Sequence, residues 1–166
     1  MKHFLFLILL LPVFAAAQKL PSIAEKTKNM TAYKGFFNFY WDEDNGKIWL
    51  EINKLDTEIL YQASLPAGLG SNDIGLDRGL MGNTSIVKFV KIGRKILMVQ
   101  PNYQYRAITN DKNERRAVEQ SFARSTLWGF VDEAENNNTV LVDATDFLLS
   151  DVMKVAETLK KNKEGN

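Results

Sequence analysis

Glycines and polar side chains are concentrated in one stretch of the chain, Gly68–Gly82, which reads GLGSNDIGLDRGLMG. It holds five of the ten glycines, and its side chains with chemical potential are Asn72, Asp73, Asp77 and Arg78. The two aspartates could form an acid–base pair, as the two carboxylates of a glycosidase do. Aspartates in a turn-rich stretch more often make local turn hydrogen bonds and one ion pair, so the sequence favours a structural role for them.

The glycine spacing of this stretch does not fit a nucleotide-binding loop. Gly68, Gly70 and Gly75 are not spaced as in the dinucleotide pattern, and no Gly-Lys-Ser/Thr motif follows. A strand-like run follows Gly82, so no helix N-terminus would face a phosphate group. We interpret the stretch as a long surface loop between two strands, and therefore as a candidate interaction loop.

Aromatic side chains suggest a second kind of site. Tyr103, Tyr105 and Arg106, together with Trp41 and Trp49, could form a platform for a ligand. Trp49 stands out because the predicted hairpin places it on the more polar face of its strand. Aromatic residues on a sheet face are often covered by a helix or by a neighbouring domain instead. The candidate interaction residues are therefore Asn72, Asp73, Asp77, Arg78, Trp49, Tyr103 and Tyr105.

The beginning of the chain has the pattern of a secretory signal peptide over residues 1–17. Lys2 precedes the apolar run Phe4–Val13, and the small residues Ala15–Ala17 provide a cleavage site before Gln18. The apolar run is too short to span a bilayer, which takes about 20 helical residues. We therefore expect a secreted or periplasmic protein with no membrane span after signal cleavage.

Composition removes several functional classes from consideration. Without residues 1–17 the chain has equal numbers of acidic and basic residues, so we expect no nucleic-acid partner. The only histidine, His3, lies in the predicted signal peptide, and the chain has no cysteine. We therefore predict no catalytic residue, no bound metal and no cofactor in this chain. Asp42–Gly46 does not form an EF-hand loop, because its glycine comes one position early and Asn53 occupies the closing position.

The remaining pattern predicts an α+β fold with an antiparallel sheet built from hairpins. Residues 18–34 read as a leader segment with one helical turn, 35–161 as a single domain that is incomplete at its C-terminus, and 162–166 as a solvated tail. The predicted hairpins cover residues 36–53, 84–100 and 125–142, and the predicted helices cover about 113–124 and about 146–161.

Local signals set the details of these elements. Asn45-Gly46 predicts a two-residue turn that places Asp44 opposite Lys47. Gly93-Arg94 and 136–138 are the turns of the other two hairpins, and both faces of 84–100 are apolar, as in the middle of a sheet. Asn113 is the predicted N-cap of the first helix. The second helix has an apolar stripe made of Leu148, Val152, Val155, Ala156 and Leu159.

Several of these segments together resemble a known family. The runs YWDEDNGKIWLEI, LYQASLPAGLGSNDIGLDRG and VLVDATDFLLSD are similar to the N-terminal region of secreted bacterial zinc-dependent metalloproteases, a region catalogued as a domain of unknown function. The resemblance extends from about residue 27 to 151. It implies a longer protein with a zinc-binding His-Glu-x-x-His helix far downstream, so zinc is expected only in that missing domain. On this basis the chain is an N-terminal fragment.

Three functional hypotheses follow. The first is a non-catalytic module that packs on or positions the downstream peptidase domain, which would be its partner, with Arg78 and the glycine-rich loop near that contact. The second is a free-standing secreted module that binds a peptide or a glycan through Trp49, Tyr103 and Tyr105. The third is a gene remnant that folds incompletely.

Overall fold

A computed structural model describes residues 19–69 and 72–162 of the chain. The predicted signal peptide and residues 163–166 of the predicted tail lie outside the described residues. The strands are β1 (Thr31–Tyr33), β2 (Asn38–Asp42), β3 (Lys47–Ile52), β4 (Ile59–Ser64), β5 (Met81–Ile92), β6 (Lys95–Gln100), β7 (Ser125–Asn136) and β8 (Thr139–Asp143). The helices are α1 (Ile23–Thr27), the 3₁₀ helix η1 (Asn72–Ile74), α2 (Lys112–Ser121), α3 (Thr145–Leu149) and α4 (Val155–Lys161).

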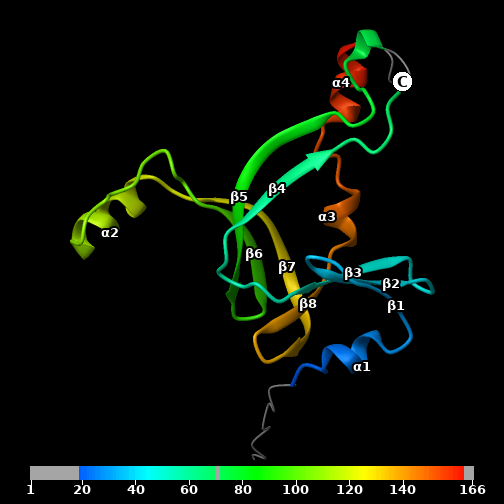
Figure 1. Ribbon diagram of the computed structural model, residues 1–166, viewed down its shortest axis with the longest axis horizontal. Helices are drawn as coiled ribbons and strands as arrows, with labels where there is room; N and C mark the ends of the chain where they lie inside the picture. Colours follow the sequence, from blue (N-terminus) through cyan, green and yellow to red (C-terminus); the bar gives the residue numbers. More distant parts are fainter. Residues whose placement is uncertain (1–18, 70–71, 163–166) are drawn as a thin grey trace, which may run out of the picture.

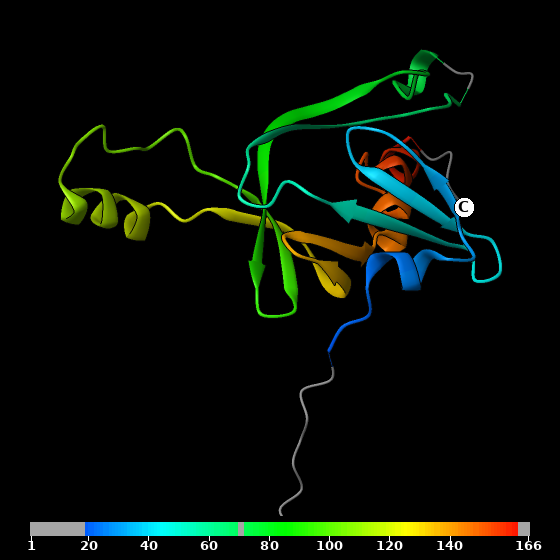
Figure 2. The same ribbon diagram turned by 60° about the horizontal axis from the view of Figure 1, so that its bottom comes forward.

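The eight described strands form one antiparallel sheet in the order β1-β2-β3-β8-β7-β6-β5-β4. Figure 1 shows two projections from this sheet: α2 lies at the end of a long arm, and the β4–β5 ribbon rises toward α4. The view in Figure 2 shows the same separation of α2 from the strands. The predicted α+β class is confirmed in broad terms, although the sheet dominates and every helix is short. No helix in this part of the chain is long and apolar enough to cross a membrane.

Both faces of the central strands are covered by apolar side chains. Successive residues of a strand point to opposite faces, so Leu141 of β8 points away from its neighbours Val140 and Val142. The first cluster of buried residues comprises Ile52, Val87, Phe89, Ile96, Met98, Phe130, Val140, Val142 and Ala144. The second comprises Ile23, Trp49, Ala134 and Leu141. Helix α1 supplies Ile23 and so covers the second face.

The first hairpin forms where it was predicted, but its predicted register is wrong by two residues. Lys47 pairs with Asp42 rather than with Asp44. The Asp42 carboxylate accepts hydrogen bonds from the backbone and side-chain nitrogens of Asn45, at 3.0–3.2 Å, and these bonds hold a four-residue turn closed by Gly46 at φ 61°. A slip of two residues keeps each side chain on its predicted face, because the side-chain period of a strand is two.

The other two hairpins are confirmed with their turns. Ile92 pairs with Lys95 across Gly93-Arg94, and Gly93 has φ 58°. Asn136 pairs with Thr139, and Asn137 occupies the left-handed region at φ 52°, where asparagine is tolerated better than most residues. Both β5 and β6 are interior strands, but β5 is next to the edge strand β4 rather than near the middle of the sheet, where it was predicted.

Helix α2 differs from its predicted bounds and from its predicted cap. Asp111, not Asn113, is the N-cap: its carboxylate accepts a 2.8 Å hydrogen bond from the backbone nitrogen of Asn113. The helix ends at Ser121 because Phe122 leaves helical geometry at φ −126° and ψ 88°. None of the residues in α2 is buried, so the sheet does not cover this helix.

The predicted C-terminal helix is wrong as a single element, since two short helices replace it. Ser150 ends α3, and its hydroxyl donates a 2.7 Å hydrogen bond to the carbonyl of Phe147. The Asp151 carboxylate then accepts hydrogen bonds from the backbone nitrogens of Val155 and Ala156, at 2.7 and 2.9 Å. These local bonds of Ser150 and Asp151 satisfy backbone groups at the break, in competition with a continuous helix.

The leader segment contacts the sheet through a backbone hydrogen bond of Pro21 and through strand β1. Ser22 and Glu25 form a reciprocal capping box at the start of α1, and the backbone nitrogen of Glu135 donates a 3.1 Å hydrogen bond to the carbonyl of Pro21. Strand β1, which the sequence did not indicate, adds to the edge of β2 with Thr31 opposite Trp41. Its three residues are too few to show a hydrophobic period.

Tyr40 gives this end of the sheet a testable pH dependence. Burial, followed by the 2.5 Å hydrogen bond that its hydroxyl donates to Glu51 and the charge of that carboxylate, raises the pKa of Tyr40 to about 12 from 10.0. The unfolded tyrosine therefore ionises first, and stability present below about pH 10 is lost as the pH rises toward 12. Because Tyr40 is partly exposed, we expect this loss to be about 1–2 kcal/mol.

Tyr40→Phe removes that titration. Urea unfolding should find the variant less stable than the wild type by about 1 kcal/mol at neutral pH, since a hydrogen bond is lost. The difference should shrink toward zero between pH 10 and about 12. A difference that stays constant over this range would contradict the assignment.

Candidate functional site

The candidate residues lie in three separate places and do not form one site. The glycine-rich loop is at the tip of the β4–β5 ribbon, Trp49 is on β3, and Tyr103 and Tyr105 are on the arm that leads to α2 (Figure 1). Each place has a different environment, and we describe them in turn.

Backbone hydrogen bonds fold the glycine-rich loop into a sequence of turns. Leu65 donates to the carbonyl of Leu80 at 2.9 Å, and Gly79 donates to the carbonyl of Leu65 at 2.8 Å. Leu76 is buried. A Cβ atom at Gly68 would lie 2.6 Å from the backbone nitrogen of Arg78, so only glycine allows this close approach of two backbone segments.

Among the described residues, the polar side chains of this loop form neither an ion pair between Arg78 and an aspartate nor a metal-binding cluster. Asp73, Asp77 and Arg78 are exposed, and within residues 19–69 and 72–162 no ion pair joins Arg78 to either aspartate. Asn72 begins helix η1. Among the described residues, no three His, Cys, Asp or Glu side chains lie close enough together to hold a metal ion.

Trp49 is a buried structural residue rather than part of an open platform. It is 5% exposed and packs with Ile23 and Leu141. The Nζ atoms of Lys26 and Lys47 lie 4.6 and 5.6 Å from the centre of its ring, distances at which a cation is attracted to an aromatic face. The sequence placed Trp49 on the correct face, but gave no sign that the leader helix covers that face.

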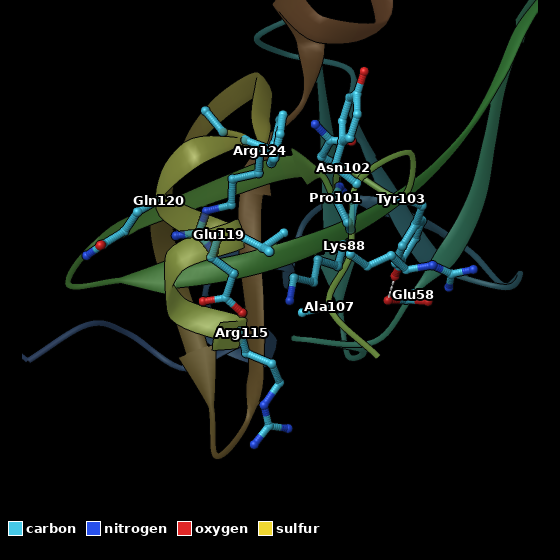
Figure 3. A pocket seen from close by; sticks show the side chains of 15 residues that line it. Glu58, Lys88, Pro101, Asn102, Tyr103, Ala107, Arg115, Glu119, Gln120 and Arg124 are labelled. Carbon is cyan, nitrogen blue, oxygen red and sulfur yellow. Dashed lines mark hydrogen bonds between the residues drawn. The ribbon is translucent and has the colours of Figure 1, made fainter. Parts of the chain in front are cut away.

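Tyr103 and Tyr105 lie in a cleft of about 710 Å³ between α2 and β5. The Tyr103 hydroxyl donates a hydrogen bond to the Glu58 carboxylate, shown as a dashed line in Figure 3. The guanidinium carbon of Arg106 lies 5.5 Å from the Tyr103 ring centre. Tyr105 stacks on Phe122 with ring centres 4.1 Å apart and an interplanar angle of 11°. The cleft is therefore an aromatic pocket with a cation beside it.

Positive charge exceeds negative charge in the lining of this cleft. The basic side chains are Lys88, Arg106, Arg115 and Arg124, and the acidic ones are Glu58 and Glu119. Figure 3 shows Lys88 extending from the strand into the space beside α2, with Glu119 on the helix side of that space. None of the four cations forms an ion pair with another described residue, so an anionic ligand could neutralise them.

Sequence reasoning found one wall of the cleft and missed the other. Tyr103, Tyr105 and Arg106 were grouped because they are adjacent in sequence. Arg115 and Phe122 were interpreted only as parts of a helix. An available signal was that α2 contains only two apolar residues, Ala117 and Val118, which are too few to pack the helix firmly on a sheet. Its basic residues, and Phe122 directly after it, are therefore free to line a cleft.

The fold and its sites define a sheet-dominated α+β module. The chain belongs to the family described as "Domain of unknown function (DUF5117)", whose model matches residues 79–166, just over half of the chain. A second model, "Domain of unknown function (DUF5118)", matches residues 20–68. Residues 69–78 lie between the two matches. No curated protein and no solved structure matches the chain.

These matches confirm that the region is a domain of unknown function, as the resemblance implied. The link to metalloproteases stays a prediction, and so does the absence of catalytic residues.

Proposed function

We propose that the chain is a non-catalytic module that packs on, or positions, the peptidase domain of a secreted zinc-dependent metalloprotease-like protein. The observation that carries this proposal is a group of exposed apolar side chains on the tip of the β4–β5 ribbon, on α3 and on the link that follows α3. This group, which we name the apolar end, consists of Leu69, Leu80, Met81, Leu148, Leu149 and Val152. Met81 is 68% exposed and Leu149 is 75% exposed.

The β4–β5 ribbon approaches the C-terminal segment at two points. Figure 1 shows α4 beside the ribbon tip. The Met153 sulfur lies 3.0 Å from the position that a Cβ atom would take at Gly82, and the rings of Tyr61 and Phe147 are 6.0 Å apart. Exposed apolar side chains that gather in one place on a protein mark an interaction surface. Contact with a further domain would remove these side chains from water, which stabilises association.

The residues of this chain do not fit a zinc site of the metalloprotease type. Its one histidine, His3, lies in the predicted signal peptide, and the chain has no cysteine. Such a site takes its ligands from His and Glu side chains. In this proposal zinc belongs to the downstream domain, and the module contributes only packing and positioning.

Two measurements test the proposal directly. Incubation of the purified secreted chain with casein should give no cleavage with or without added zinc. Zinc-dependent cleavage that a chelator abolishes would refute a non-catalytic role. The coding sequence that follows the codon for Asn166 provides the second measurement: an in-frame His-Glu-x-x-His motif is the expected result, and a reading frame that ends there without one would contradict the parentage.

The apolar end can be tested on its own with a dye that fluoresces on exposed apolar patches. We expect the double variant Met81→Ser, Leu149→Ser to bind much less of the dye than the wild type. Its thermal midpoint should hardly change, since both side chains are exposed. Ile108→Ser is the matched control, because Ile108 is 95% exposed but lies on the arm rather than at the apolar end. Equal dye loss in both variants would contradict a defined surface.

A further inference from the structure

We infer that the cleft between α2 and β5 binds an extended, acidic segment of peptide that carries an apolar side chain. This inference goes beyond the proposed function, because the cleft would bind such a segment whether or not the module packs on a peptidase domain. It depends on the shape of the cleft, on an open strand edge, on the charge of the lining and on one stacked aromatic pair.

The cleft is elongated rather than round. A second pocket of about 330 Å³ adjoins it and shares Pro101, Asn102, Tyr103 and Ala123 with it. Together they run from α2 along the arm to Thr84 and Ser85 on β5. Small-molecule sites typically have volumes of about 300–1,000 Å³. The added length of the second pocket leaves room for several residues of an extended chain.

The second pocket opens onto an unpaired strand edge. β5 pairs with β4 from Met81 to Val87, but with β6 only from Lys88 to Ile92. The chain leaves β6 after Gln100 and enters the arm. In the described residues, therefore, no strand lies beside this edge of β5 at Thr84 and Ser85, which precede Lys88. An extended peptide can add to such an edge through main-chain hydrogen bonds, which is a common mode of peptide recognition. A glycan has no comparable backbone, so the open edge favours a peptide.

The positive charge of the lining favours a negatively charged ligand. Glu58 already accepts a hydrogen bond from Tyr103, and Glu119 is the one other carboxylate in the first pocket. Four cations and only these two carboxylates line the pocket, and Arg106 and Arg124 are exposed at the surface. Carboxylates on the ligand would gain charge-assisted hydrogen bonds with the guanidinium groups, which bind carboxylates in a bidentate geometry.

The aromatic pair favours a ligand that carries an apolar or aromatic side chain. Tyr105 and Phe122 are both more than a third exposed, and their stacked rings form an aromatic part of the cleft wall. An apolar or aromatic side chain of the peptide would cover this wall and bury its surface. An acidic segment with one aromatic residue therefore satisfies the strand edge, the cations and the wall at the same time.

Titration calorimetry with two matched peptides tests the inference. The first probe is acetyl-Asp-Glu-Phe-Glu-Asp-amide, and the control is its neutral counterpart acetyl-Asn-Gln-Phe-Gln-Asn-amide. We expect the secreted chain to bind the acidic peptide at least about tenfold more tightly, which corresponds to about 1.4 kcal/mol. Raising the NaCl concentration from about 50 to about 300 mM should weaken binding, because salt screens exposed charges. In amide NMR spectra, Thr84, Ser85 and Ile86 should shift on binding.

Variants separate the cleft from general charge attraction. Arg106→Gln, Arg124→Gln should weaken binding of the acidic peptide about tenfold. Lys28→Gln, Lys160→Gln removes the same charge from exposed positions on other parts of the molecule, and it should leave binding within about twofold of the wild type. Circular dichroism confirms that both double variants fold.

Three results with the peptides and variants would overturn the inference. They are no binding of the acidic peptide up to about 1 mM, equal binding of the two peptides, or equal weakening by the two double variants. Binding of a neutral oligosaccharide such as maltohexaose without binding of the acidic peptide would also overturn it, and would favour a glycan site.

Discussion

Replacing Leu141 by alanine should lower the free energy of unfolding by about 3 kcal/mol, within the range for a buried leucine. Leu141 is fully buried on β8, where it packs with Ile23, Trp49 and Ala134. The variant loses the transfer free energy of the removed atoms and leaves a cavity that the strands on either side cannot close. Since Ile23 and Trp49 would lose contacts, the packing of α1 on the sheet should loosen as well.

Leu60→Ala is the matched control, because Leu60 is also a strand leucine but is 74% exposed. Its effect should stay within about 0.5 kcal/mol. Urea unfolding followed by tryptophan fluorescence measures both variants, and hydrogen exchange of the α1 amides reports the loosening of that helix. Similar losses in the two variants would mean that the second core cluster does not stabilise the fold.

The hairpins could be predicted from the sequence because their signals are local. Gly93-Arg94 and 136–138 interrupt strand-like runs, and each turn lies within a few residues of the strands that it joins. The predicted register of the first hairpin was wrong, because the prediction took Asn45-Gly46 as the two central residues of the turn. The hydrogen bonds of Asp42 with Asn45 favour the longer turn.

Strand order could not be predicted, because its contacts connect distant parts of the chain. β3 pairs with β8 through Trp49 opposite Asp143 and Ile52 opposite Val140, and no local pattern marks strands so far apart in sequence as neighbours. The C-terminal helix was wrong for a different reason. Its apolar stripe has a helical period, but Ser150 and Asp151 bind backbone groups and interrupt the helix.

The candidate sites also differ in whether they depend on local sequence or on contacts between distant parts of the chain. Tyr103, Tyr105 and Arg106 could be grouped because they are adjacent in sequence, and the structure places all three in one cleft. The covering of Trp49 depends on contacts with the leader helix, more than twenty residues away. Whether a residue is a ligand contact or a core residue therefore depends on packing that period and composition do not describe.

Replacing Lys91 by methionine should also cost about 3 kcal/mol at neutral pH, because it leaves a buried carboxylate without its partner. The Asp132 side chain has no exposed surface, and Lys91 Nζ lies 2.6 Å from Asp132 Oδ2 and 2.6 Å from Glu135 Oε2. The second oxygen of Asp132 has no hydrogen-bond partner among the described residues. Methionine keeps the unbranched apolar stem and removes the charge, so the variant isolates the electrostatic contribution.

The pH dependence distinguishes this mechanism from a loss of packing. Burial raises the pKa of Asp132 above 3.8, although the hydrogen bond and the charge of Lys91 oppose that rise, so removal of Lys91 should raise it further. A raised carboxyl pKa means that the stability due to the bound proton is present at low pH and is lost as the pH rises through the folded-state pKa. The difference between variant and wild type should therefore be largest near neutral pH and should shrink toward pH 3.8.

Two controls complete the measurement. Lys95→Met removes an exposed lysine at the start of β6 and should change stability by less than about 0.5 kcal/mol. Lys91→Met, Asp132→Asn removes both charges, so it should be more stable than Lys91→Met alone at neutral pH, with little pH dependence of its own from this pair. If Lys91→Met loses the same stability at every pH, the charge of Lys91 does not stabilise the Asp132 carboxylate, and the proposed mechanism is wrong.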